Sequence, residues 1–311
     1  MTRIISAIQQ PPTIPAAASL AHAFTTDAFN SFVACTYILE LVDTVRMCKQ
    51  SNFKNGAKTN SSSASKALKS LYILTSFLSL FMVAWIVVFP SSWLMGRSEF
   101  HDHIINEKLV KTYAGTSVSP RTVTKYAGHS LVQFTHIAPG AIWAGAIPFQ
   151  INPNFRRQHR LAHKMVGYAF VISAFLMAFG ICVIFARDLT FHNDYDGIPP
   201  PDSSELLQMK LSSFLLTTYF VCSALLAVYY AGWAKDIQRH QKWIIRHIGS
   251  GMWIAVQRIV VMICQGAGLV SGPMMMRNLF GNAATGSVFV SILLAEIAIR
   301  CLNQYGVKKI V

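Results

Sequence analysis

The stretch HKMVGYAFVISAFLMAFGICVIFA (residues 163–186) decides the fold class of this chain. Lys164, near its start, is the only residue in the stretch that carries a permanent charge. The stretch is longer than the ~20 residues that a helix needs to cross the hydrocarbon core of a bilayer. Lipid requires every backbone polar group to be satisfied internally, and a helix does this within one segment. The stretch therefore predicts a transmembrane helix.

Apolar runs of similar length recur along the chain. They cover residues 71–95, 126–149, 211–234, 243–270 and 285–301. The last run is the weakest, because Glu296 and Arg300 interrupt it. Together with 163–186, the runs predict an all-α polytopic membrane bundle of six transmembrane helices.

The composition supports a lipid-solvated protein. Of the 311 residues, 53% are hydrophobic and only 13% are charged, whereas about a quarter of a soluble domain is charged. The net charge is +14, but the basic residues flank apolar runs and do not cluster on a soluble face. This placement argues against nucleic acid and predicts anionic lipid headgroups as partners. The six cysteines form no CxxC pair, so neither a disulfide framework nor a zinc site is expected.

Residues 1–70 differ from the membrane domain that we expect over 71–311. They predict a mobile cytosolic segment, because 49–69 is a Ser/Asn/Lys-rich linker. Residues 29–45 read as a helix crowded by acidic side chains, which favours an amphipathic helix lying on the membrane. A further transmembrane span over the same residues is the alternative.

Loop charges predict the orientation. Basic residues fill the segment before the first run, the loops at 156–164 and 235–246, and the tail at 308–309. The alternate loop at 187–208 is acidic, with Asp and Glu outnumbering the basic residues. By the positive-inside rule both termini lie in the cytosol. The loop at 97–125 does not fit this rule, since it places basic residues, mixed with acidic ones, on the outer side.

Ionisable residues inside predicted spans are costly and usually face the bundle interior, and three of them carry the main site hypothesis. They are His136, Arg258 and Glu296, which we place at similar depth on three helices. With Gln133 and Gln257 as helpers, they predict a polar intramembrane site for a proton relay or for binding or transport of a small polar ligand. The alternative is a membrane scaffold in which Arg258 and Glu296 form a structural ion pair.

A second constellation is basic and lies at the predicted cytosolic edge. It comprises Arg156, Arg157, Arg160, Lys164, Arg239, His240 and Arg246. Anchoring in anionic lipid headgroups is one interpretation of this patch. Binding of a phosphate or another anion by the side chains and helix N-termini is the sharper one.

The histidines raise a redox alternative. Membrane b-type cytochromes ligate haem iron with histidines from different helices of a bundle. His163 and His247, both near the inner edge, could form one such pair. No Walker loop, dinucleotide fingerprint, HExxH or GxSxG motif occurs, so no reaction is assigned.

Two blocks carry a resemblance to a known family. They are HIAPGAIWAGAIPFQINPNFRRQHRLAHKMVGYAF (136–170) and HQKWIIRHIGSGMWIAVQRIV (240–260). With Glu296 in LLAEIAI, they resemble the predicted-membrane-protein family catalogued as domain of unknown function 2306. The chain departs from that pattern at Lys164 and Tyr168, where the family tends to have Arg. The resemblance implies the membrane fold and the choice of site residues, and it implies no activity.

Overall fold

A computed structural model of the chain describes residues 60–88, 125–126, 128–194, 198–270 and 272–306. All of them belong to the compact unit Gly56–Val311. The predictions made for residues 1–59, which include the interfacial helix, and for most of the loop at 97–125 lie outside the described residues.

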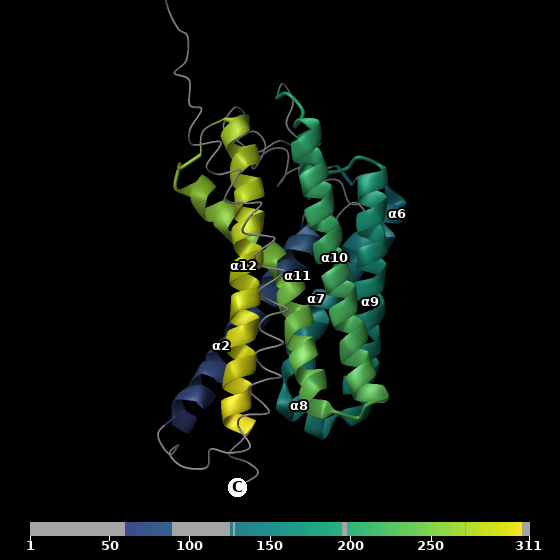
Figure 1. Ribbon diagram of the computed structural model, residues 1–311, viewed down its shortest axis with the longest axis vertical. Helices are drawn as coiled ribbons and strands as arrows, with labels where there is room; N and C mark the ends of the chain where they lie inside the picture. The colour runs from purple at the N-terminus through teal and green to yellow at the C-terminus, as the bar shows by residue number, and fades with distance from the viewer. Residues whose placement is uncertain (1–59, 89–124, 127, 195–197, 271, 307–311) are drawn as a thin grey trace, which may run out of the picture. The chain divides into compact units, whose positions relative to one another are not determined.

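The described residues are helical and contain no strand (Figure 1). The helices are α2 (Asn60–Val88), α6 (Ser130–Val132), η4 (Gln133–Ile137), α7 (Ala138–Ile151), α8 (Pro153–Gln158), α9 (Arg160–Ala186), η5 (Phe191–Asp194), α10 (Ser203–Gly232), α11 (Ile237–Gly266) and α12 (Pro273–Gly306). Among these, α2, α9, α10, α11 and α12 are each long and apolar enough to cross a membrane. The all-α prediction is confirmed, and these five helices have the length and apolar composition that the multi-pass prediction requires.

The second predicted span is a composite. The short helix α6, the π-helix η4 and the helix α7 follow one another without a break from Ser130 to Ile151. Pro139 lies just beyond the π-turn. A proline has no N–H and its ring clashes with the carbonyl four residues earlier, and a wider turn relieves that clash.

The helices extend beyond the apolar runs because their polar flanks also favour helix. Asp202 caps α10, since its side chain accepts a hydrogen bond from the backbone N–H of Glu205 at 2.7 Å. Asp236 caps α11 in the same way through the N–H of Arg239 at 3.0 Å. Apolar runs therefore mark the stretch within lipid, whereas capping residues mark the helix ends.

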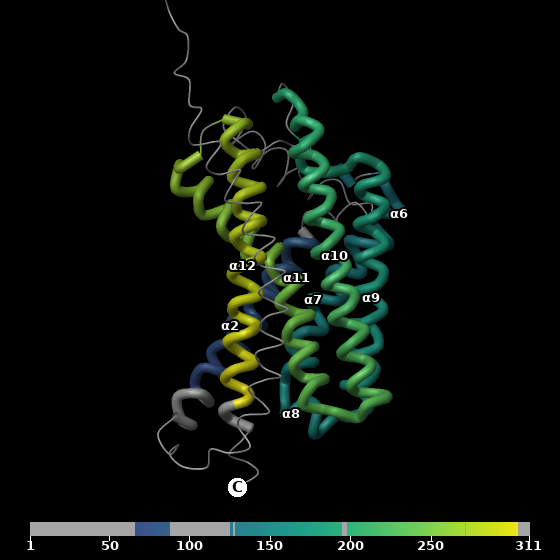
Figure 2. The backbone as a smooth tube through the Cα atoms, viewed as in Figure 1, coloured from purple at the N-terminus to yellow at the C-terminus, as the bar shows by residue number. Residues whose placement is uncertain are grey.

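Helix α11 is the centre of the bundle and packs against α2, α10 and α12 (Figure 2). Two glycines permit this. A Cβ at Gly249 would lie 2.7 Å from the Cβ of Ala295 on α12, and one at Gly251 would lie 2.5 Å from the Trp143 ring on α7. Backbone and side chains meet too closely at both positions for any other residue.

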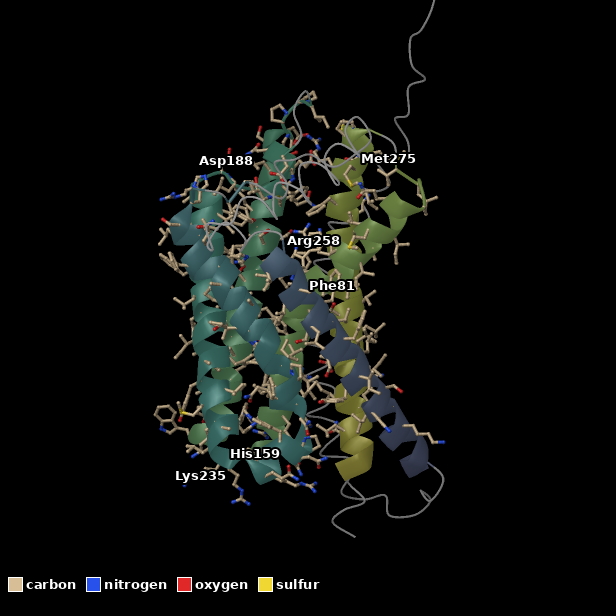
Figure 3. All side chains as sticks on the ribbon, turned by 180° about the vertical axis from the view of Figure 1, so that it is seen from behind. Phe81, His159, Asp188, Lys235, Arg258 and Met275 are labelled. Carbon is tan, nitrogen blue, oxygen red and sulfur yellow. The ribbon has the colours of Figure 1, made fainter. Side chains whose placement is uncertain are left out.

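Helix α2 has two unlike halves. From Leu78 onward it contributes buried residues, and the Ser79 hydroxyl donates to the carbonyl of Ala144 on α7 at 2.5 Å. Between Lys66 and Phe77 none of its residues is buried. In Figures 1 and 3 this first half leans away from the rest of the bundle.

Candidate functional site: a cavity at the basic end of the bundle

The predicted ion pair between Arg258 and Glu296 is wrong, because Glu296 pairs with Arg246. The Nε of Arg246 lies 2.7 Å from Oε1 of Glu296, and its Nη2 lies 3.4 Å from Oε2. Both side chains are buried, at 7% and 8% exposure. This bidentate pair joins α11 to α12 in a setting where an unpaired charge would be costly.

The register of the two helices explains the correction. They run antiparallel, with Gly249 opposite Ala295. Arg258 is three turns further along α11, about 18 Å from Arg246 at a rise of about 1.5 Å per residue. Figure 3 shows Arg258 in the half of the bundle toward Asp188, away from His159.

Arg258 lies among aromatic rings. Its guanidinium is 4.6 Å from the ring centroid of Phe280 and 5.4 Å from that of Trp85, within the range of a cation–π contact. The neighbouring Gln257 donates from Nε2 to the Phe280 carbonyl at 2.9 Å. Both predicted polar residues therefore hold α11 against its neighbours at this level.

His136 is on the π-helix η4. Its Nδ1 is 3.1 Å from the carbonyl oxygen of Met177 on α9, to which it donates. Gln133, one turn earlier, is buried. No hydrogen bond or ion pair joins His136 to Arg258 or Glu296 among the described residues, so the structure does not assemble the predicted three-residue site.

His247 is fully buried and both of its ring nitrogens are engaged. Trp143 donates from Nε1 to its Nε2 at 3.0 Å. That bond requires an unprotonated Nε2, so Nδ1 carries the hydrogen and donates to the Phe220 carbonyl at 3.0 Å. The ring centroids of Trp143, Phe170 and Phe220 lie 5.7, 5.2 and 4.3 Å from that of His247.

These contacts do not fit the predicted haem ligation. An iron ligand needs a free imidazole nitrogen facing open space, whereas Trp143 occupies Nε2 of His247 and aromatic rings enclose the imidazole. His163, the other predicted ligand, lines a cavity that His247 does not reach. The described residues also contain no group of three or more His, Cys, Asp or Glu side chains that could hold a metal ion.

A cavity of about 710 Å³ opens between α2, the α7–α8 turn, α11 and α12. Its interior is apolar and is lined by residues such as Leu71, Leu74, Leu78, Ile248, Met252 and Val256. Its mouth is polar and is lined by Lys69, Arg156, Arg157, His163, His240 and Gln241. We call the side of the bundle that carries α8 and the turn between α10 and α11 the basic end, and the mouth lies there.

The predicted basic patch divides at this cavity. Arg156, Arg157 and His240 line the mouth. The others do not: Arg160 and Lys164 are exposed outside it, Arg239 pairs with Asp236 at 3.4 Å, and Arg246 pairs with Glu296. Lys69 and His163 complete the mouth, whereas the sequence had placed Lys69 in a predicted linker and His163 among the predicted haem ligands.

Hydrogen bonds fix the mouth. Asn152 caps α8 by accepting from the N–H groups of Asn154 and Phe155, at 2.9 and 3.2 Å, and donates to the Tyr72 hydroxyl on α2 at 3.3 Å. With its amide oxygen facing Arg156, Gln241 on α11 accepts from both Nη atoms of that guanidinium, at 2.5 and 3.3 Å. These bonds tie α8 to α2 and α11, so the cations of α8 are held in place over the cavity.

At the opposite end of the bundle, charged side chains are paired within the protein. Lys125 and Asp194 form an ion pair of 2.7 Å with side chains 9% and 1% exposed. Arg277 donates to the Pro199 carbonyl at 2.7 Å. Burial, together with the positive charges of Arg277 and Lys125, lowers the pKa of the neighbouring His192 to about 4.

No protein-family model, no curated protein and no solved structure matches this chain. The resemblance to the domain of unknown function 2306 family therefore stays a prediction.

Proposed function

We propose that this chain is a six-span membrane protein that binds an amphipathic, lipid-like molecule in the cavity at its basic end. The observation that carries the proposal is a cavity with an apolar interior and a polar mouth, placed at one end of an apolar bundle. Cavities of this volume lie within the range of roughly 300–1,000 Å³ that small-molecule sites occupy.

The six-span topology rests on continuity and on charge. Residues 130–151 are helical throughout and long enough for a crossing, although the π-turn divides them into three pieces. Counted with the five long helices, they give an even number of crossings. The positive-inside rule then places the basic end, and the mouth of the cavity, on the cytosolic side.

The depth of the cavity supports a lipid as ligand. Along α11 its lining runs from Gln241 at the mouth to Val256, about 22 Å at a rise of about 1.5 Å per residue. One leaflet contributes about 15 Å of hydrocarbon to a core of about 30 Å. A small polar ligand would leave this apolar depth unused, whereas a hydrocarbon chain would fill it.

The Arg246–Glu296 pair supports a structural role for Glu296 in place of the proton relay or small-ligand site expected from the sequence. A bidentate guanidinium already satisfies the carboxylate, and both groups are buried. The adjacent residues Ile245 and Ala295 line the cavity, so the pair braces its rear wall.

Lipid retention by the purified protein tests the proposal. The protein is extracted in mild detergent, washed, and assayed for bound lipid by native mass spectrometry. Ala298→Phe places a ring in the cavity, because Ala298 lines it. We expect at least a tenfold loss of bound lipid in this variant.

Leu293→Phe is the matched control, since Leu293 is on the same helix, is 63% exposed and does not line the cavity. It should retain wild-type lipid binding. A wild-type protein that washes free of lipid, or an Ala298→Phe variant that keeps all of it, contradicts the proposal.

A further inference from the structure

We infer that the cavity selects a lipid whose headgroup is a phosphate anion with no compensating amine. The inference rests on the proposed lipid-binding function and names the chemical class of its ligand. It is carried by the charge and placement of the side chains at the mouth.

The mouth of the cavity is cationic. Lys69, Arg156 and Arg157 line it, and no Asp or Glu is among the described residues that line the cavity. The ammonium group of a zwitterionic headgroup would find no carboxylate there. It would also find no aromatic cage, because Tyr72 is the only Phe, Tyr or Trp among the same residues.

The arginines at the mouth differ from two other arginines of the basic end. Arg239 and Arg246 are each satisfied by a carboxylate of the protein, on Asp236 and Glu296. Within the described chain neither Arg156 nor Arg157 forms an ion pair. At the mouth, a bound anion would supply the negative charge that Asp236 and Glu296 supply to the other two arginines.

The donors also come from separate elements. Lys69 is on α2, whereas Arg156 and Arg157 are on α8. A carboxylate can be satisfied by one bidentate arginine, whereas a phosphate presents three or four oxygens in different directions. Donors placed around a mouth suit the phosphate.

Competing lipids with identical chains test the inference. Detergent-solubilised full-length protein is titrated with dioleoyl phosphatidic acid and with dioleoyl phosphatidylcholine, and binding is measured by native mass spectrometry. Inorganic phosphate and glycerol 3-phosphate serve as chain-free probes. We expect phosphatidic acid to bind at least tenfold more tightly than phosphatidylcholine, and both chain-free probes to bind at least a hundredfold more weakly than phosphatidic acid.

The double variant Arg156→Gln/Arg157→Gln should weaken phosphatidic acid binding at least tenfold and abolish the preference, because it removes two of the cations that line the mouth. Arg160→Gln/Lys164→Gln removes the same charge from exposed positions outside the mouth and should keep the preference. Chain-free phosphate that binds as tightly as phosphatidic acid would overturn the inference in favour of a soluble anion. Equal binding of both lipids would overturn the headgroup selectivity and leave the lipid cavity standing, whereas binding of neither would remove the cavity function itself.

Discussion

The two ends of the bundle handle their charges differently. At the opposite end Lys125 is neutralised by Asp194 and Arg277 is bound to a backbone carbonyl, so the protein satisfies its own cations. At the basic end Arg156 and Arg157 face a cavity that contains no acidic lining residue among those described. The first arrangement stabilises the fold, whereas the second leaves cationic side chains for a ligand. Removing a charge should therefore destabilise the fold at the opposite end and weaken ligand binding at the mouth of the cavity.

The largest effect on stability is expected at the rear wall of the cavity, where the basic end contains the buried ion pair between Arg246 and Glu296. Arg246→Met leaves Glu296 buried without its ion-pair partner and should lower the free energy of unfolding by about 3–5 kcal/mol. The measurement is unfolding in mixed micelles followed by circular dichroism.

The double variant Arg246→Met/Glu296→Leu removes both charges and should recover most of that loss. A double variant as unstable as the single one would show that the two side chains do not act as a pair.

The opposite end should be nearly as sensitive. Asp194→Asn leaves Lys125 buried without a counter-charge and should cost about 2–4 kcal/mol, seen as a lower thermal midpoint. Asp236→Asn is the control, because its pair with Arg239 is exposed and Asn still caps α11. It should cost less than about 0.5 kcal/mol, and an equal loss in both variants would remove the distinction between buried and exposed pairs.

Charge removal at the mouth should leave the fold intact. Arg157→Gln is expected to change the free energy of unfolding of lipid-free protein by less than about 0.5 kcal/mol, since this exposed side chain forms no ion pair with the described residues. Added phosphatidic acid should raise the thermal midpoint of the wild type more than that of the variant. A variant that unfolds as readily as Asp194→Asn would place Arg157 among the structural charges.

The last effect concerns pH. The pKa of His192 is about 4 in the folded protein and about 6.5 in an unfolded chain. Between these values the unfolded state binds the proton and the folded state does not, so stability falls as pH falls from about 6.5 to 4. His192→Gln should flatten that slope in thermal unfolding, whereas exposed His159→Gln should not. An unchanged slope in His192→Gln would assign the acid sensitivity to other groups.

The sequence predicted the helical membrane class because long apolar runs need no tertiary information. It also predicted that Arg156, Arg157 and His240 belong together. It failed at Arg258 and Glu296, since pairing across two antiparallel helices depends on their register, and Gly249 against Ala295 sets that register. Counting residues from the basic ends of α11 and α12 would have placed Arg246 level with Glu296.

The cavity could not be predicted, because it depends on the first half of α2 leaning away from the bundle. Nothing in the apolar pattern of 71–95 distinguishes the half that packs from the half that does not. The hydrogen bond that fixes the second half, from Ser79 to the Ala144 carbonyl, joins segments that are distant in the sequence. The same tilt of α2 brings Lys69 to the mouth of the cavity.

The π-turn at 133–137 has a consequence for how this protein can tolerate change in length. A π-turn holds one residue more than the α-turn it replaces, so it behaves as an insertion stored within the helix. Deleting one residue there restores an ordinary α-turn and leaves the preceding segment in its orientation relative to α7, because a π-turn and an α-turn each complete one revolution of the helix. Val132 should therefore stay buried, and Trp143 should keep its bond to His247. Homologous chains that lack this residue should retain both features.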